Sequence, residues 1–254
     1  IIRELLKDPN CVVTRGSTYE NRSNLAPAFF RQIIRRYEGT RLGRQELYAE
    51  VLDDVPGALW TRQVLDDSRV SHIPDLVRIV VAIDPAITAN EDGESNETGI
   101  IVAGIDANDH GYVLEDLSGY YTPAQWAETA VKAYDRWAAD RVVAEANQGG
   151  DMVAHTIYTA GRDLAERGER KTRNVAVTMV HASRGKHTRA EPVSAVYEQG
   201  RCHHVGMFPE LEDQMCTWVP GEDSPDRMDA MVWAFTELNI VDQAVEYAPS
   251  IWDN

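Results

Sequence analysis

Residues 76–85 read LVRIVVAIDP, a continuous apolar run that is rich in β-branched side chains and stops at Asp84-Pro85. A run without polar alternation predicts a strand that is buried on both faces. We therefore expect this strand to lie near the centre of a sheet, with Asp84 at its carboxyl end.

The residues after this strand show alternating strand and helix signals, which favour one α/β domain. Strands are predicted at 99–106, 112–117, 141–146 and 174–181, and helices at 123–138, 150–167, 189–199 and 226–240. The first two of these strands are joined through Asn108–Gly111, a hairpin signal. The order β-β-β-α-β-α-β-α with a closing helix excludes an all-parallel sheet. It predicts a ribonuclease-H-like mixed β-sheet flanked by helices.

The segment before the apolar run differs from the rest. It is rich in Arg and predicts helices over 24–37 and 41–52, and Pro56-Gly57 and Asp66–Ser68 indicate a linker. The chain starts within a helix pattern and without Met, as expected of a fragment. We predict a mainly helical N-terminal segment, residues 1–70, and a second domain, residues 71–254.

The charge distribution leaves two interpretations open. The 254 residues carry a net charge of −16, which by itself argues against nucleic acid as a partner. Residues 160–205, however, hold nine basic and five acidic side chains between two strongly acidic segments. Clustered carboxylates can solvate a surface or hold divalent cations that attract phosphate. No apolar run is long enough to cross a bilayer, and three scattered cysteines predict no disulfide framework.

Three acids stand in apolar surroundings: Asp84, Glu145 near the end of the strand at 141–146, and Asp229 within the last helix. One such acid alone is often an ordinary strand-end or surface residue. Three together indicate a shared cation, because burying an unpaired carboxylate costs several kcal/mol. If the strands at 76–83 and 141–146 are neighbours, Asp84 and Glu145 share one sheet edge. Asp226 would lie on the same helical face as Asp229.

Carboxylate oxygens suit Mg²⁺ or Mn²⁺, and two such ions about 4 Å apart can hydrolyse a phosphodiester. Other features are weaker. Arg162, Arg167, Arg170, Lys171 and Arg173 can contact a DNA backbone or form a solvated face. Cys202-His203-His204 with Cys216 fits no common zinc spacing.

Three stretches resemble the nuclease motifs of the large terminase subunit of tailed bacteriophages, and they occur in the same order: VAIDP (81–85), VAEANQGG (143–150) and DRMDAMVWA (226–234). Further similarity lies in HASRGK (181–186), RAEP (189–192) and YEQGR (197–201). VTRGSTYEN (13–21) and YEGTRLGRQEL (37–47) resemble the end of that family's packaging ATPase domain.

The resemblance implies a ribonuclease-H-like endonuclease that cuts concatemeric double-stranded DNA with two divalent metals, Mg²⁺ or Mn²⁺. By position, the catalytic metal ligands would be Asp84, Glu145 and Asp229, with Asp226 as a further ligand. The DNA-binding residues would be Lys186, Arg189 and Arg184. Implied partners are DNA, the terminase ATPase domain, the portal or procapsid and the small terminase subunit. The implied location is the host cytoplasm, not the mature virion and not a membrane.

The chain departs from the whole family member in one respect, since it contains no G-x-x-x-x-G-K-S/T phosphate-binding motif. A complete packaging motor is therefore not expected. Two other functions remain. An actin-like ATP-binding domain would need small Gly-Thr turns after Asp84, where Pro85 and an acidic loop stand instead. A docking module without enzymatic activity would use the acidic surfaces to contact a portal or the motor.

Overall fold

The computed structural model describes residues 11–12, 14, 16–28, 30–31, 34, 47–48, 54–85, 97–146, 150–181, 186–222 and 225–241. The chain divides into two compact units, residues 1–53 and 54–254. In the first unit, a short 3-10 helix η1 (Arg22–Asn24) precedes helical residues at 27–28, 30–31, 34 and 47–48. Residues 25–26 of the predicted helix at 24–37 are not helical, and the remaining residues of the two predicted N-terminal helices lie outside the described part of the chain. The domain limit at residue 70 stays a prediction.

The second unit is built on a mixed sheet, which within the described residues has eight strands. The strands are β1 (Arg69–Val70), β2 (Leu76–Asp84), β3 (Glu97–Asp106), β4 (Gly111–Asp116), β5 (Gly119–Tyr120), β6 (Arg141–Glu145), β7 (Val177–Val180) and β8 (Cys202–Val205). Their order is β1-β8-β4-β3-β2-β6-β7, with β5 paired to β3 outside this path. Strand β2 is antiparallel to β3 and parallel to β6. The predicted mixed sheet is confirmed, and β2 is central in it.

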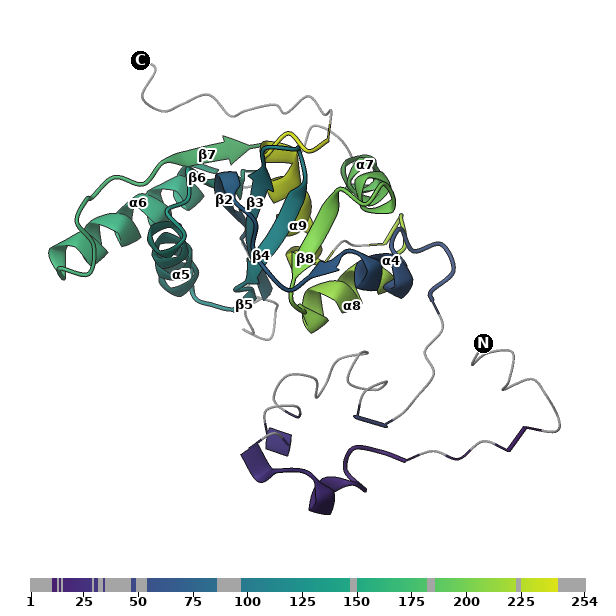
Figure 1. The fold of residues 1–254 in the computed structure, drawn as a ribbon. Coiled ribbons are helices and arrows are strands. Elements are labelled where there is room, and N and C mark those ends of the chain that lie inside the picture. Colours follow the sequence, from purple (N-terminus) through teal and green to yellow (C-terminus); the bar gives the residue numbers. More distant parts are fainter. Residues whose placement is uncertain are drawn as a thin grey trace. The chain divides into compact units, whose positions relative to one another are not determined.

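Helices cover both faces of the sheet (Figure 1). They are α4 (Arg62–Asp67), α5 (Pro123–Arg136), α6 (Gly150–Glu166), α7 (Lys186–Glu198), α8 (Pro209–Thr217) and α9 (Asp226–Glu237). Helices α5 and α6 pack on one face, and α7, α8 and α9 share a hydrophobic core with the other face. The start of α5 follows from its sequence, because Thr122 and Gln125 form a capping box and Pro123 fits the first turn.

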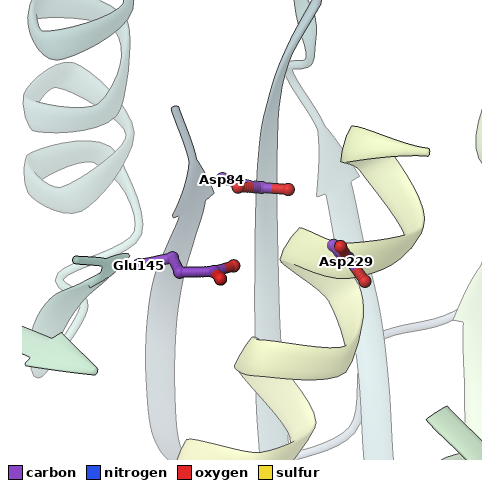
Figure 2. Close-up of side chains that lie close together, drawn as sticks. All are labelled: Asp84, Glu145 and Asp229. Atoms are coloured by element: carbon purple, nitrogen blue, oxygen red, sulfur yellow. The ribbon is translucent and has the colours of Figure 1, made fainter. Parts of the chain in front are cut away.

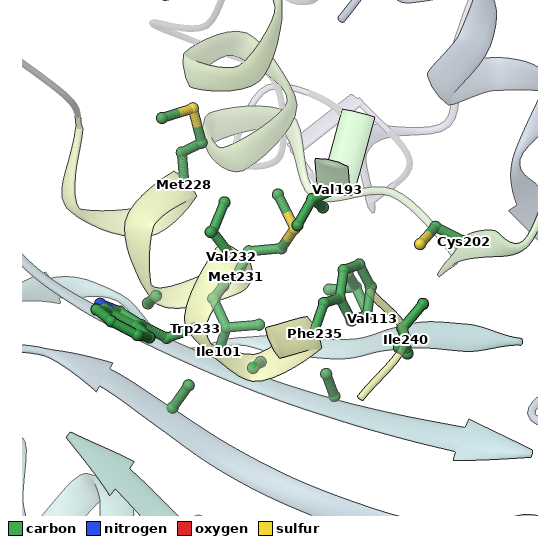
Figure 3. Packing of buried hydrophobic residues seen from close by; sticks show 14 of the residues in the cluster. Ile101, Val113, Val193, Cys202, Met228, Met231, Val232, Trp233, Phe235 and Ile240 are labelled. Carbon is green, nitrogen blue, oxygen red and sulfur yellow. The ribbon is translucent and has the colours of Figure 1, made fainter. Parts of the chain in front are cut away.

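The alternation of β2 explains how one strand serves two cores. Val80 and Ala82 belong to the core beneath α9, whereas Val81 and Ile83 belong to the core beneath α5 and α6. Successive side chains of a strand point to opposite faces, so both sets are buried. Figure 3 shows the α9 side of this packing, where Phe235 and neighbouring α9 side chains meet residues such as Ile101.

The linker predicted at Asp66–Ser68 is wrong in its local structure. Residues 62–67 form helix α4, whose start is capped by the side chain of Thr61, which accepts a hydrogen bond from Val64 N–H. Leu65 of α4 is fully buried in the core beneath α9. The Thr61 cap was a local signal for this helix, but Asp66-Asp67 obscured it. The short strand β1 and helix α8 also lack a strong sequence pattern.

A buried polar network binds α4 and β1 to helix α8. The Glu212 carboxylate of α8 is fully buried and accepts hydrogen bonds from Arg69 (2.8 Å) and Arg62 (3.3 Å). His204 Nδ1 lies 3.1 Å from the same carboxylate, and its Nε2 lies 2.7 Å from the Tyr197 hydroxyl. Burial alone would raise the pKa of Glu212, but hydrogen bonds from His204 and Arg69 outweigh it and hold that pKa well below its usual value.

Replacement of Glu212 by Gln should lower the free energy of unfolding at pH 7 by about 3 kcal/mol, because it leaves Arg62 and Arg69 facing a neutral amide. A depressed pKa contributes stability above the unfolded-state pKa of about 4.3, and the contribution falls as pH drops below that value. Urea unfolding of the wild type and Glu212→Gln between pH 7 and pH 3 measures the difference. A difference that stayed constant below pH 4 would contradict this role.

Candidate metal centre

Two of the predicted acids end neighbouring parallel strands. In the pairing of β2 with β6, Ile83 lies opposite Ala144, so Asp84 and Glu145 are the next residues along the two strands. Because Ile83 and Ala144 face α5 and α6, strand alternation turns both acids toward α9. The two strands are neighbours, which is the condition under which the sequence places Asp84 and Glu145 at one sheet edge.

The third acid, Asp229, lies in the first turn of α9 and is almost completely buried. Helix α9 reaches the sheet there because Gly99, the β3 partner of Asp84, has no side chain. A Cβ atom on Gly99 would lie 2.0 Å from the backbone oxygen of Asp226. The missing side chain therefore lets the helix start lie directly over the strand beside Asp84.

The start of α9 is also tied down by polar contacts. Arg227 forms ion pairs with Glu97 of β3 (2.7 Å) and Asp116 of β4 (2.8 Å). Burial alone would lower the pKa of Arg227, but Asp116 and Glu97 outweigh it and raise that pKa. Gln214 of α8 donates to Glu97 and accepts from the Met228 N–H. These contacts fix the first turn of α9 against the sheet.

Asp84, Glu145 and Asp229 thus converge from two strands and one helix (Figure 2). One carboxylate oxygen from each lies within 4.8 Å of the others. Glu145 and Asp229 are 6% and 2% exposed, so water screens their mutual repulsion poorly. Three oxygen donors of this kind match the ligands that Mg²⁺ and Mn²⁺ prefer. The donor set fits a hard divalent cation.

Glu145 has two neighbours on the α9 side. The Trp233 indole N–H donates a 2.7 Å hydrogen bond to its Oε2 atom. Arg189 Nη1 lies 3.8 Å from the same oxygen, and the guanidinium carbon lies 4.3 Å from the centre of a Trp233 ring. Arg189 is therefore buried beside the acid cluster rather than on an open surface.

The other predicted site residues have different fates. Asp226 is the first residue of α9 and is not part of the three-carboxylate group. Arg184 and the side chain of Lys186 lie outside the described residues. Neither Gly99 nor Trp233 was predicted for the site. The spacing of Trp233, one helical turn after Asp229, was the available signal, because residues four apart share a helix face.

Several basic side chains of residues 162–173 form ion pairs with acidic side chains of the same chain. Arg170 forms hydrogen bonds of 2.8 and 2.9 Å with the Asp135 carboxylate. Arg167 pairs with Glu128 and Glu169. The exposed Arg167 fits the solvated-face interpretation, whereas the Arg170 side chain is buried in its pairing with Asp135.

The cysteines and histidines form no zinc cluster in the described part of the chain. There, the group of Asp84, Glu145 and Asp229 is the one set of three or more potential ligands. Cys202 and His204 are instead buried in the core and its polar network. Within the same residues, each helix is too short or too polar to cross a membrane.

Several solved structures share this fold. A large terminase from a thermophilic bacteriophage superposes with a TM-score of 0.50 at 15% identity, over 87% of this chain and 54% of that one. The chain therefore spans about half the length of that protein. The nuclease domain of the large terminase subunit gp2 of bacterial virus Sf6 gives a TM-score of 0.50 at 11% identity, over 70% and 98% of the two chains.

A variant of the Sf6 nuclease domain, in a structure with manganese and beta-thujaplicinol, also gives a TM-score of 0.50, at 12% identity over 70% and 98% of the chains. Among proteins with curated descriptions, none matches this sequence significantly. The family model described as the terminase RNaseH-like domain matches residues 81–238, which include all three acids and most of the sheet. The chain belongs to the terminase RNaseH-like domain family.

Proposed function

We propose that this chain is the divalent-metal-dependent endonuclease domain of a viral DNA-packaging terminase. The observation that carries the proposal is the convergence of Asp84, Glu145 and Asp229 within 4.8 Å. Family membership and the manganese in the Sf6 nuclease-domain structure support it. The substrate would be concatemeric double-stranded DNA, cut at the start and end of packaging.

In the proposed mechanism, Asp84, Glu145 and Asp229 hold one or two Mg²⁺ or Mn²⁺ ions. When bound, such ions polarise a phosphodiester and lower the pKa of an attacking water. The chain supplies the fixed geometry, since two acids end paired strands and the third is held by the fastened start of α9. Asp226 is proposed as an additional ligand, and Arg184, Lys186 and Arg189 as groups that attract the DNA backbone.

The remaining parts of the proposal concern the larger assembly. Residues 1–70 would be the C-terminal remnant of the large subunit's ATPase domain and its linker, and the nuclease domain would work with the small subunit and the portal in the host cytoplasm. The alternative is a docking module without enzymatic activity, whose acidic surfaces contact a portal or the rest of the motor. Metal-dependent cleavage distinguishes the two.

We expect the purified chain to nick and linearise supercoiled plasmid in Mn²⁺ or Mg²⁺ and to be inactive in EDTA. The assay belongs at low ionic strength, because a protein with a net charge of −16 binds DNA weakly when salt competes. Calorimetric titration with Mn²⁺ alone, in the absence of DNA, runs in parallel. Cleavage that persists in EDTA would refute the metal mechanism, and a chain that shows neither Mn²⁺ binding nor cleavage would favour the docking module.

A further inference from the structure

The contact between Trp233 and Glu145 joins a helix to one of the proposed metal ligands. The indole N–H donates to Glu145 Oε2 at 2.7 Å, and both side chains are buried, at 3% and 6% exposure. A hydrogen bond from a neutral donor to a carboxylate is stronger than one between neutral groups, and low exposure strengthens it further. The bond therefore restricts rotation of the Glu145 carboxylate.

Trp233 lies on the same face of α9 as Asp229, so the hydrogen bond holds Glu145 on the side of the acid cluster. Trp233 and Asp229 are four residues apart and share one helix face. The same face therefore provides one acid of the cluster and orients another that comes from β6. In Figure 2, the Glu145 carboxylate extends from its strand toward the α9 helix that carries Asp229.

Arg189 of α7 packs over the face of the indole ring. Its guanidinium carbon lies 4.3 Å from the ring centre, within the range of a cation–π contact, and its Nη1 lies 3.8 Å from Glu145 Oε2. Trp233 is therefore held by a cation that packs on its ring and by an acid that accepts a hydrogen bond from its N–H. Figure 3 shows the indole within the packed core of α9.

We infer that Trp233 is a positioning residue for the metal centre: it presents the Glu145 carboxylate to the cation, and Arg189 keeps the indole in place. The inference rests on the proposed metal-dependent nuclease and assigns Trp233 no direct contact with metal or DNA. Partners that orient a metal ligand through a hydrogen bond commonly change metal affinity 10- to 100-fold when they are removed.

The test is Trp233→Phe, which keeps an aromatic ring for packing and removes the N–H donor. Calorimetric titration with Mn²⁺ should show an affinity about 10- to 100-fold weaker than that of the wild type. The Mn²⁺ concentration for half-maximal plasmid cleavage should rise by a similar factor. The rate at saturating Mn²⁺ should change only a few-fold, because the three carboxylates remain. A loss of packing alone would not produce this separation.

Trp218→Phe is the matched control. Trp218 is equally buried and belongs to the same core, but its indole N–H donates to the backbone oxygen of Glu222 at 3.3 Å. The Mn²⁺ affinity of Trp218→Phe should stay within about twofold of wild type, since no acid of the cluster accepts a hydrogen bond from the Trp218 indole. Equal Mn²⁺ affinity in folded Trp233→Phe and wild type would overturn the inference and leave the proposed function intact.

A second measurement on the wild type covers the case in which Trp233→Phe fails to fold. The indole N–H resonances are followed by NMR during titration with Mg²⁺. One resonance should shift strongly, because its acceptor carboxylate also binds the cation. Binding of Mg²⁺ with no shift of any indole resonance would refute the inference. A wild type that binds neither Mn²⁺ nor Mg²⁺ would overturn the metal centre itself.

Discussion

Replacement of Asp84 by Asn should lower the rate of plasmid cleavage by at least about a thousandfold, which corresponds to about 4 kcal/mol of transition-state stabilisation. The amide has nearly the shape of the carboxylate, so the end of β2 should keep its backbone. One of the three charges that are proposed to hold a divalent cation is lost. Single-turnover cleavage at a fixed, saturating concentration of Mn²⁺ measures the effect.

Thermal unfolding of Asp84→Asn provides a second measurement, in which the substitution should raise stability although it lowers the cleavage rate. Without metal, removal of one of three crowded negative charges should raise the melting temperature. The further rise that Mn²⁺ produces in the wild type should shrink. Asp75→Asn is the control. Asp75 is exposed and directly precedes Leu76, the first residue of β2, at the opposite end of the strand from Asp84. Cleavage by Asp84→Asn at close to the wild-type rate would remove Asp84 from the mechanism.

Replacement of Gly99 by Ala should both destabilise the domain and weaken metal binding. The added Cβ would lie 2.0 Å from the Asp226 backbone oxygen and 2.5 Å from its carbonyl carbon, so the first turn of α9 must move. Overpacking against backbone at this site should cost about 3 kcal/mol of unfolding free energy. Because Asp229 belongs to the displaced turn, Mn²⁺ affinity should fall as well. Urea unfolding and calorimetry test the two effects separately.

Gly104→Ala is the comparison for this variant, since Gly104 lies on the same strand away from the acids. Its Cβ would meet the Cδ1 atom of Leu76, the far end of a flexible side chain, at 2.7 Å, and the backbone oxygen of Arg78 only at 3.2 Å. We expect a cost of about 1 kcal/mol and unchanged Mn²⁺ affinity. If Gly99→Ala kept wild-type stability and affinity, the close approach of α9 would not be what positions Asp229.

The sequence was sufficient to predict the parts of the site that depend on local periodicity. The apolar run of β2 predicts a central strand, and the acids at the ends of β2 and β6 could be aligned once the two strands were assumed to adjoin. The α9 pattern placed Asp229 on a helix that packs on the sheet. These inferences need only the repeat of a strand or helix and the chain order.

Contacts between distant segments could not be predicted in the same way. Gly99 and Asp226 are far apart in the chain, and no pattern near a single glycine reveals which backbone approaches it. Trp233 reads as a core residue, and its hydrogen bond to Glu145 depends on the register of α9 over β6. The linker prediction at Asp66–Ser68 is wrong because α4 is stabilised by the Thr61 cap and by burial of Leu65, and that burial depends on contacts with distant segments.

The position of α9 late in the described chain has a consequence for protein synthesis. A growing polypeptide leaves the ribosome from its N-terminus, so the strands that carry Asp84 and Glu145 emerge well before the helix that carries Asp229. The same helix supplies much of the core on its face of the sheet. Completion of that core and assembly of the three acids therefore both wait for α9, and an unfinished chain would lack the third acid of the proposed metal centre.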